Sequence, residues 1–236
     1  ETIVNTLKPD VVLTNFAHHP WENADVLPAR NLGIPTLYVG HGITGYLSAV
    51  RDAASTQYYG VLGEYFKDAL MEVFNWSEDE LALIGHPQLD HQLPLPDKRH
   101  SKIRFRLNPD QPVCIFCDMS EFMQAFEQRH STYTTLHEIV KLKTHIPNLQ
   151  IVYRTHHGVS SAVKIREYLS SLNLPGVHFQ TSPNPPLMEI AQAADLVISH
   201  YTSAVTEALI IGVPVIYLTA LASEVEPSFM NCEAIK

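Results

Sequence analysis

The stretch ADLVISHYTSAVTEALIIGVPVIYL, residues 194–218, decides the fold that we expect for this chain. It contains a short apolar run, a hydroxyl-rich turn, a helical pattern and a second apolar run. Strands that alternate with helices in this manner are typical of parallel α/β units. The turn contains Thr202 and leads directly into the predicted helix, which begins at Ser203. Hydroxyls and unpaired N–H groups at such a position favour a bound phosphate, and capping of the helix by either hydroxyl is compatible with that role.

The alternation of strands and helices continues along the whole chain. We expect an α/β protein with two Rossmann-like doubly wound domains that face a cleft: residues 1–92, a proline-rich linker over 93–112, and residues 113–236. The sequence begins within a helix–strand unit, so we expect the first domain to be truncated at its N-terminus and the second to lack its last helices. The expected strands are 11–15, 36–40, 81–84, 113–117, 149–153, 177–180, 196–199 and 215–218, and the expected helices are 24–31, 63–74, 135–145, 162–172, 187–193 and 203–211.

The composition narrows the class of protein. The chain has 236 residues, with 16 Lys and Arg against 25 Asp and Glu, which gives a formal net charge of −9. This acidic balance argues against a nucleic-acid-binding protein, and the 45% of hydrophobic residues argues against disorder. No apolar run is long enough for a transmembrane helix. We therefore expect a globular protein of the cytoplasm, with association at a membrane surface as a further option.

The three cysteines do not suggest a disulfide framework. Cys114 and Cys117 form a C-x-x-C pattern inside a predicted buried strand. Residues three apart on a strand point to opposite faces of the sheet, so the two thiols should diverge. We interpret both as core residues rather than as zinc ligands or as a redox pair.

Histidines follow five of the predicted strands, at the ends where parallel sheets bind ligands. They are His18 and His19, His41, His86, His156 and His157, and His200. Zinc requires three or four converging ligands, and neighbouring histidines on a regular strand do not converge easily. The sequence also lacks the H-E-x-x-H helix motif. We therefore expect a ligand-binding cleft without a metal ion.

Two charged residues complete the predicted ligand site. Glu207 lies one helical turn beyond the hydroxyl-rich turn, where its carboxylate would accept hydrogen bonds from a ribose diol. Arg154 follows the predicted strand 149–153, where a guanidinium would stabilise a phosphate, and a surface ion pair is the alternative for this residue. The predicted donor-binding residues are Arg154, His156, His200, Thr202, Ser203 and Glu207.

Several of these segments resemble motifs of one group of enzymes. The run His200-Tyr-Thr-Ser203, with Glu207 four places on and Val213-Pro214 before the next strand, resembles the donor-binding block of GT-B-type transferases. Three further segments resemble other motifs of the same group: Arg154-Thr-His-His157, Gly40-His-Gly42 and Gly85-His-Pro-Gln-Leu-Asp90. The chain is most similar to the CDP-glycerol glycerophosphotransferases and the capsule polysaccharide glycosyltransferases. UDP-N-acetylglucosamine 2-epimerases share the architecture and carry two glycines where Thr202 and Ser203 stand.

The resemblance implies a metal-independent, inverting transferase that moves a sugar or a polyol phosphate from a nucleotide-activated donor to a surface glycan. It implies a donor-binding second domain and an acceptor-side first domain, with no cofactor besides the donor. The expected partners are a nucleotide-sugar donor and a glycan acceptor, with peripheral contact at the inner membrane face as an option and no nucleic acid. We predict His41 as the general base, with His18 and His19 as its competitors. The alternative functions are a UDP-N-acetylglucosamine 2-epimerase-like enzyme and a non-catalytic nucleotide-sugar-binding domain.

Overall fold

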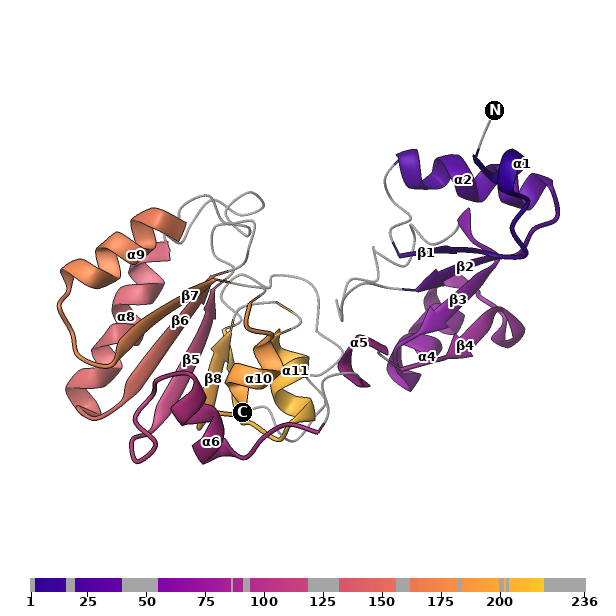
Figure 1. Cartoon of the computed structure of the whole chain (residues 1–236). Coiled ribbons are helices and arrows are strands. Elements are labelled where there is room, and N and C mark those ends of the chain that lie inside the picture. Colours follow the sequence, from indigo (N-terminus) through magenta and orange to yellow (C-terminus); the bar gives the residue numbers. More distant parts are fainter. Residues whose placement is uncertain are drawn as a thin grey trace. The chain divides into compact units, whose positions relative to one another are not determined.

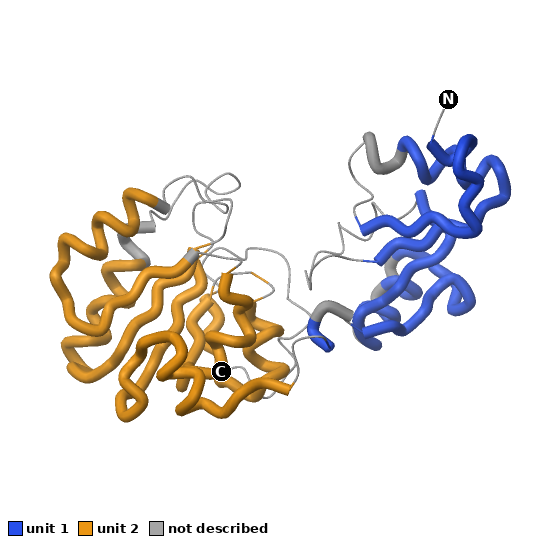
Figure 2. The backbone as a smooth tube through the Cα atoms, viewed as in Figure 1, with its two compact units in different colours: residues 1–91, 225–228 blue, residues 92–224, 229–236 orange. Residues whose placement is uncertain are grey.

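The chain divides into two compact α/β units, which we describe separately (Figure 2). The computed structural model describes residues 3–15, 20–39, 55–85, 87–90, 94–118, 132–155, 162–181, 184–199, 202 and 204–218. Of these, the residues up to Asp90 belong to the first unit and those from Pro94 onward belong to the second. Within these ranges, none of the helices has the length and apolar character needed to cross a lipid bilayer.

The first unit is built on a parallel sheet of four strands in the order β1-β2-β3-β4 (Figure 1). The strands are β1 (Val12–Thr14), β2 (Thr36–Val39), β3 (Tyr58–Val61) and β4 (Leu81–Leu83). The helices are α1 (Ile3–Leu7), α2 (Pro20–Asn31), α4 (Glu64–Phe74), the 3-10 helix η2 (Glu78–Glu80) and α5 (Pro87–Asp90). Gly33 follows α2 with φ +72°, a conformation that ends a helix and favours glycine, as the sequence predicts.

The sequence predicts only three strands in this unit, and the structure contains a fourth, β3. β3 lies between β2 and β4, so β4 is the fourth strand and the edge of the sheet. At Gly60, in the middle of the strand, a Cβ atom would come within 2.6 Å of Ile84 Cδ1, so a larger residue there would require that side chain to shift. Tyr59 packs between two aromatic neighbours, with ring centroids 4.9 Å from Tyr38 and 6.0 Å from Trp76. The strand is thus held by aromatic packing rather than by the apolar run that usually reveals a buried parallel strand.

The second unit contains a parallel sheet of five strands in the order β7-β6-β5-β8-β9. The strands are β5 (Val113–Asp118), β6 (Gln150–Thr155), β7 (Val177–Thr181), β8 (Leu196–Ser199) and β9 (Val215–Tyr217). The helices are α6 (Lys98–Arg104), α8 (Thr132–His145), α9 (Ala162–Ser171), α10 (Leu187–Ala191) and α11 (Ala204–Ile210). The chain runs outward from β5 to β7 and then returns to β8 on the other side of β5. Right-handed crossovers therefore place α8 and α9 on one face and α10 and α11 on the other, which is the predicted doubly wound arrangement (Figure 1).

Alternate residues of these strands form two separate cores. Val152 belongs to the core beneath α10 and α11, and its neighbour Ile151 belongs to the core beneath α8 and α9. Cys117 lies in the first of these cores and Cys114 in the second, so the predicted divergence of the two thiols is confirmed. Burial raises the pKa of each thiol to about 12, which makes both unreactive at neutral pH.

Part of the segment expected as a linker is helical and packs onto the second unit. Helix α6 begins at Asp97, whose carboxylate accepts a hydrogen bond from the His100 N–H at 2.9 Å. Lys102 on this helix is only 5% exposed, and its Nζ donates to Asp195 at 3.2 Å and to the Gln111 carbonyl at 2.8 Å. Burial alone would raise the pKa of Asp195, but hydrogen bonds from Lys98, the Val113 N–H and Lys102 bring it below its ordinary value. The expectation of irregular structure is therefore wrong for these residues, because the prolines flank the helix instead of interrupting it.

Candidate functional site

The candidate site lies at the carboxyl ends of the strands in the second sheet. The parallel register aligns Gln180 of β7, Arg154 of β6, Cys117 of β5 and Ser199 of β8 in one row. Residues that align across parallel strands share a face, and Cys117 belongs to the core beneath α10 and α11. The row therefore points toward α10 and α11, at the edge where open parallel sheets bind ligands.

Arg154 is a buried cation in this row. Its side chain is 5% exposed, and Nη2 donates a hydrogen bond to the Pro185 carbonyl at 2.7 Å. Nη1 is also buried and has no hydrogen-bond partner among the described residues. Burial lowers the pKa of Arg154, while the nearby Cys117 thiol and Glu207 carboxylate act in the opposite direction. A buried guanidinium with an N–H group that has no partner among the described residues is suited to binding an anion.

This placement corrects one detail of the prediction for Arg154. The predicted strand 149–153 ends before Arg154, but β6 continues to Thr155 and pairs with both β5 and β7 up to that residue. Arg154 therefore projects from the strand itself into the buried row. The alternative of a surface ion pair does not hold, because the guanidinium is buried and bonds to a carbonyl group.

Glu207 connects helix α11 to the start of helix α10. Its carboxylate accepts a hydrogen bond from the backbone N–H of Met188, in the first turn of α10. Burial raises the pKa of Glu207, and the charge of Arg154 and the Met188 N–H oppose that effect. Because the Pro186 N-cap supplies no side-chain hydrogen bond, Glu207 takes over the role of a cap for α10. A carboxylate has acceptor capacity beyond one bond, so binding of a ribose diol by Glu207 stays a prediction.

Thr202 caps the helix that follows it. Its hydroxyl oxygen accepts a hydrogen bond from the Ala204 N–H at 3.4 Å, and its carbonyl accepts from the Val205 N–H at 3.2 Å. The simpler of the two roles expected for this hydroxyl is thus confirmed. A hydroxyl that accepts one bond can still donate its own hydrogen, so the phosphate-binding role stays a prediction.

The remaining predicted residues lie outside the described residues. They are His18, His19, His41, His86, His156, His157, His200 and Ser203. The structure therefore tests the placement of Arg154, Thr202 and Glu207 only, and it brings Arg154 and Glu207 close enough for their charges to interact. Among the described residues, His, Cys, Asp and Glu side chains form no group of three or more that would hold a metal ion.

The structure also shows polar groups that the sequence analysis missed. Gln180 carries a buried side-chain oxygen that has no partner in the described part of the chain. On the other face of the sheet, Asp118 ends β5 and accepts a hydrogen bond from the Tyr153 hydroxyl. Gln180 stands at the end of a predicted strand, so the rule that drew attention to the histidines would have selected it too. Its alignment with Arg154, however, depends on the strand register.

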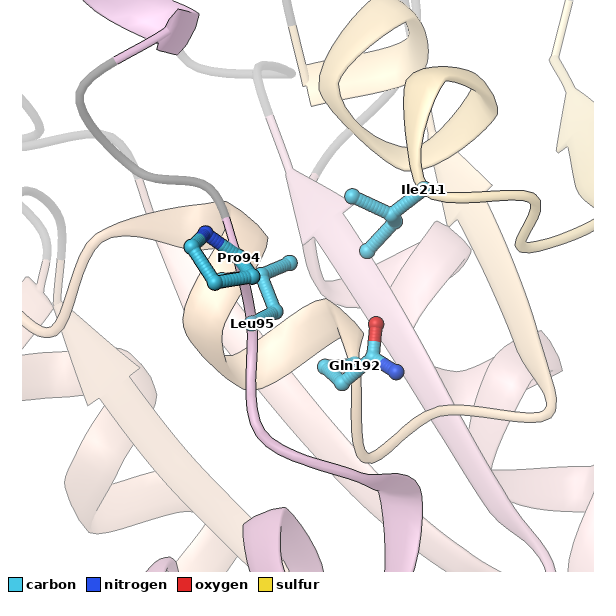
Figure 3. A pocket seen from close by; sticks show the side chains of 4 residues that line it. All are labelled: Pro94, Leu95, Gln192 and Ile211. Carbon is cyan, nitrogen blue, oxygen red and sulfur yellow. The ribbon is translucent and has the colours of Figure 1, made fainter.

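A shallow hollow of about 580 Å³ on the second unit is a weaker candidate (Figure 3). Pro94, Leu95, Gln192 and Ile211 line it. Gln192 and Ile211 follow the last turns of α10 and α11, so the hollow lies near the amino ends of the strands. It is therefore separate from the row at the carboxyl ends.

Comparison with known proteins supports the fold. No protein-family model matches the chain, and no curated protein matches it in sequence. Among solved structures, the chain is similar to Methanocaldococcus jannaschii UDP-GlcNAc 2-epimerase in complex with UDP-GlcNAc and UDP, at 18% identity and a TM-score of 0.65. The match covers 92% of this chain and 62% of that one.

Two further solved structures give the same architecture. Neisseria meningitidis UDP-GlcNAc 2-epimerase bound to UDP-GlcNAc matches at 18% identity and a TM-score of 0.63, over 99% of this chain and 65% of that one. A variant of the wall teichoic acid polymerase TagF soaked with CDPG matches at 13% identity and a TM-score of 0.56, over 89% of this chain and 53% of that one.

These likenesses establish the class of fold. The chain is an α/β protein with two parallel, Rossmann-like sheets that match structures of the GT-B fold. It spans about three fifths of the length of the epimerases. The predicted fold is thereby confirmed. The particular group of enzymes named by the motifs stays a prediction.

Proposed function

We propose that this chain belongs to an enzyme that uses a nucleotide-activated substrate, and that its second unit binds the diphosphate or monophosphate of that substrate. The observation that carries the proposal is the buried guanidinium of Arg154 near the carboxyl end of β6, whose Nη1 has no hydrogen-bond partner among the described residues. The nearby Glu207 carboxylate offsets part of this buried charge, and an anion at Nη1 would satisfy the group that has no partner among the described residues. The similar structures support the choice of anion, since those of the epimerases contain UDP-GlcNAc.

The finer proposal is a transferase that moves a sugar or a polyol phosphate to a glycan acceptor. Thr202 and Ser203 stand where the 2-epimerases are expected to carry two glycines, and the hydroxyl of Thr202 can still donate a hydrogen bond. The chemistry proposed is metal-independent, with Arg154 stabilising the charge that develops on the leaving phosphate. His156, His200 and Ser203 are proposed to complete the donor site of the second unit.

A 2-epimerase-like activity is the second candidate. The observation that favours it is the higher TM-score of the two epimerases, 0.65 and 0.63, against 0.56 for the TagF variant. All three structures are less than 20% identical to this chain, so the difference in TM-score reflects the similarity of the folds and says nothing about the reaction. The two functions must therefore be separated by assay.

The first experiment separates these functions from a non-catalytic binding domain. The chain is incubated with CDP-glycerol, UDP-GlcNAc and a panel of CMP- and GDP-sugars, with and without a glycan acceptor, in buffer containing EDTA. A transferase consumes the donor only when acceptor is present, an epimerase isomerises UDP-GlcNAc without acceptor, and a binding domain shows affinity in calorimetry without turnover. Absence of binding to every nucleotide by the folded chain would contradict the proposal as a whole.

The second experiment tests the proposed general base. A neutral imidazole has a pKa near 6.5 in its unperturbed state, which suits it to deprotonate an acceptor hydroxyl at neutral pH. If His41 is this base, His41→Ala should reduce turnover by about 10²- to 10⁴-fold with donor affinity nearly unchanged. Wild-type turnover by His41→Ala at saturating acceptor would reject the assignment, and His18→Ala and His19→Ala in the same assay would locate the base.

A further inference from the structure

A second long polar side chain lies beside Arg154, and the proposed donor site makes no use of it. Gln180 on β7 is in register with Arg154 on β6. Val177 and Phe179 pack against the core beneath α8 and α9, so the alternation of the strand turns Gln180 toward the face that Arg154 shares. Neighbouring strands lie about 4.8 Å apart, which brings both side chains within reach of one ligand.

Each of these side chains buries a polar atom that has no partner in the described ranges. The atoms are Oε1 of Gln180, an acceptor, and Nη1 of Arg154, a charged donor. The two atoms are chemically complementary, they belong to residues in register on neighbouring strands, and no hydrogen bond joins them. A ligand with an anionic group and a nearby hydrogen-bond donor would satisfy both atoms at once.

We propose that Gln180 is a specificity-determining residue of the donor site, whose amide oxygen accepts a hydrogen bond from an N–H or O–H group of the ligand held by Arg154. This inference rests on the proposed function for the nature of the ligand. A pyrophosphate group that is ionised at neutral pH has little hydrogen to donate. The donating group therefore belongs to the base, to the ribose or to the group that is transferred.

The test exploits opposite effects on stability and on binding. Gln180→Met keeps the length of the side chain and removes an unpaired buried acceptor, so the melting temperature should stay constant or rise by about 2–4 °C. The same change should weaken binding of CDP-glycerol or UDP-GlcNAc by about three- to tenfold in calorimetry, since one neutral hydrogen bond is lost. Gln180→Leu provides a second variant, so that the result does not depend on how methionine packs.

His178→Phe is the matched control. His178 lies on the same strand and the same face, two residues before Gln180, and its Nε2 is likewise buried with no partner in the described part of the chain. The replacement removes an unpaired atom further from the carboxyl edge. We expect an equal or higher melting temperature and unchanged affinity for every nucleotide.

The ligand panel identifies the group that donates a hydrogen bond to Gln180. A loss with CDP and UDP assigns the donating group to the nucleoside, and a loss confined to CDP-glycerol or UDP-GlcNAc assigns it to the transferred group. Binding of inorganic pyrophosphate should not change. An equal loss with pyrophosphate, or wild-type affinity of folded Gln180→Met for all probes, overturns the inference. If the wild-type chain binds no nucleotide, the proposed function has failed instead, and this outcome is distinguishable because it does not involve the variant.

Discussion

The two faces of the second sheet use the same strands for different purposes. On the face toward α8 and α9, Tyr153 stacks between Phe116 and Phe179, with ring centroids 5.5 Å and 6.1 Å away, and its hydroxyl bonds to Asp118. On the face toward α10 and α11, Arg154, Gln180 and His178 each bury a polar atom with no partner among the described residues. The first face also holds one such atom, Oγ1 of Thr155, so the two faces differ in how many polar atoms they bury without a partner among the described residues.

This difference follows from the alternation of side chains along a strand. Tyr153 and Arg154 are consecutive residues, yet one belongs to an aromatic core and the other to a polar row. Unpaired buried polar groups lower stability, so a protein retains them where they serve a ligand or a water molecule. We therefore expect substitutions on the first face to change stability, and substitutions of Arg154 and Gln180 at the carboxyl edge of the second face to change binding.

The largest effect is expected on the aromatic face. Phe116 has no exposed surface, so Phe116→Ala should lower the free energy of unfolding by about 3–5 kcal/mol through lost burial and the cavity left behind. Urea unfolding followed by circular dichroism measures this change. Nucleotide affinity should be close to that of the wild type at temperatures where the variant is folded. A loss of nucleotide binding without a loss of stability would contradict the assignment of a purely structural role to this face.

The next effect is expected at Arg154. Arg154→Met removes a charged hydrogen-bond donor and should weaken binding of CDP or UDP by about 1.5–3 kcal/mol, measured at temperatures where the variant is folded. Arg166 on the other face is the matched control, because its guanidinium lies 4.8 Å from the centroid of the Phe179 ring and away from the row. Calorimetry should show wild-type affinity for Arg166→Met. Equal losses for the two variants would mean that net charge, and not position, governs binding.

A smaller effect is expected at Glu207. If its carboxylate binds a ribose diol, Glu207→Gln should weaken the binding of ribonucleotides by about 0.5–1.5 kcal/mol more than the binding of the matching deoxyribonucleotides. The glutamine oxygen can still accept the Met188 N–H, so the start of α10 should keep its cap. Glu189→Gln, one residue beyond Met188, controls for a general effect of charge on α10. Equal losses for ribo- and deoxyribonucleotides would assign Glu207 to the support of α10 and Arg154 alone.

The smallest effect is expected at His178 and concerns pH. Burial, followed by the charge of Lys143, lowers the pKa of His178 in the folded chain. As the pH falls below the ordinary histidine pKa near 6.5, this residue takes up a proton in the unfolded chain before it does so in the folded chain. The free energy of unfolding is therefore highest above that pH and decreases as the pH falls toward the lower pKa of the folded chain. His178→Phe should remove this part of the decline. Unfolding curves with the same pH dependence for variant and wild type would contradict the assignment.

The sequence predicts most of the second unit because its strands are apolar and its helices are bounded by clear signals. Leu196–Ser199 is found at its predicted limits, and the opposite placement of Cys114 and Cys117 follows from the period of a strand alone. Strand β3 escapes prediction because it depends on Tyr59 packing against aromatic residues from other elements. Helix α6 escapes it because the prolines around it resemble a linker, while the Asp97 cap is a weaker signal.

The candidate site shows where sequence reasoning ends. Arg154, Thr202 and Glu207 carry residue types that suggest a phosphate or a ribose, and they can be selected from the sequence. The pairing of Arg154 with Gln180, and the bond from the Met188 N–H to Glu207, join residues from separate elements. These relations depend on strand register and on the packing of α10 against α11, which no local pattern specifies.

The cluster around Asp195 has a consequence for the order in which the second unit folds. Asp195 accepts hydrogen bonds from Lys98 and Lys102, which lie 97 and 93 residues earlier in the chain. Closing a loop of that length in an unfolded chain costs about 4 kcal/mol of entropy, more than such a pair returns. Pairing of β5 with β8 brings these partners together, so we expect the contact to form late in folding. A contact that forms late slows unfolding more than it speeds folding, and we therefore expect this one to prolong the lifetime of the native sheet.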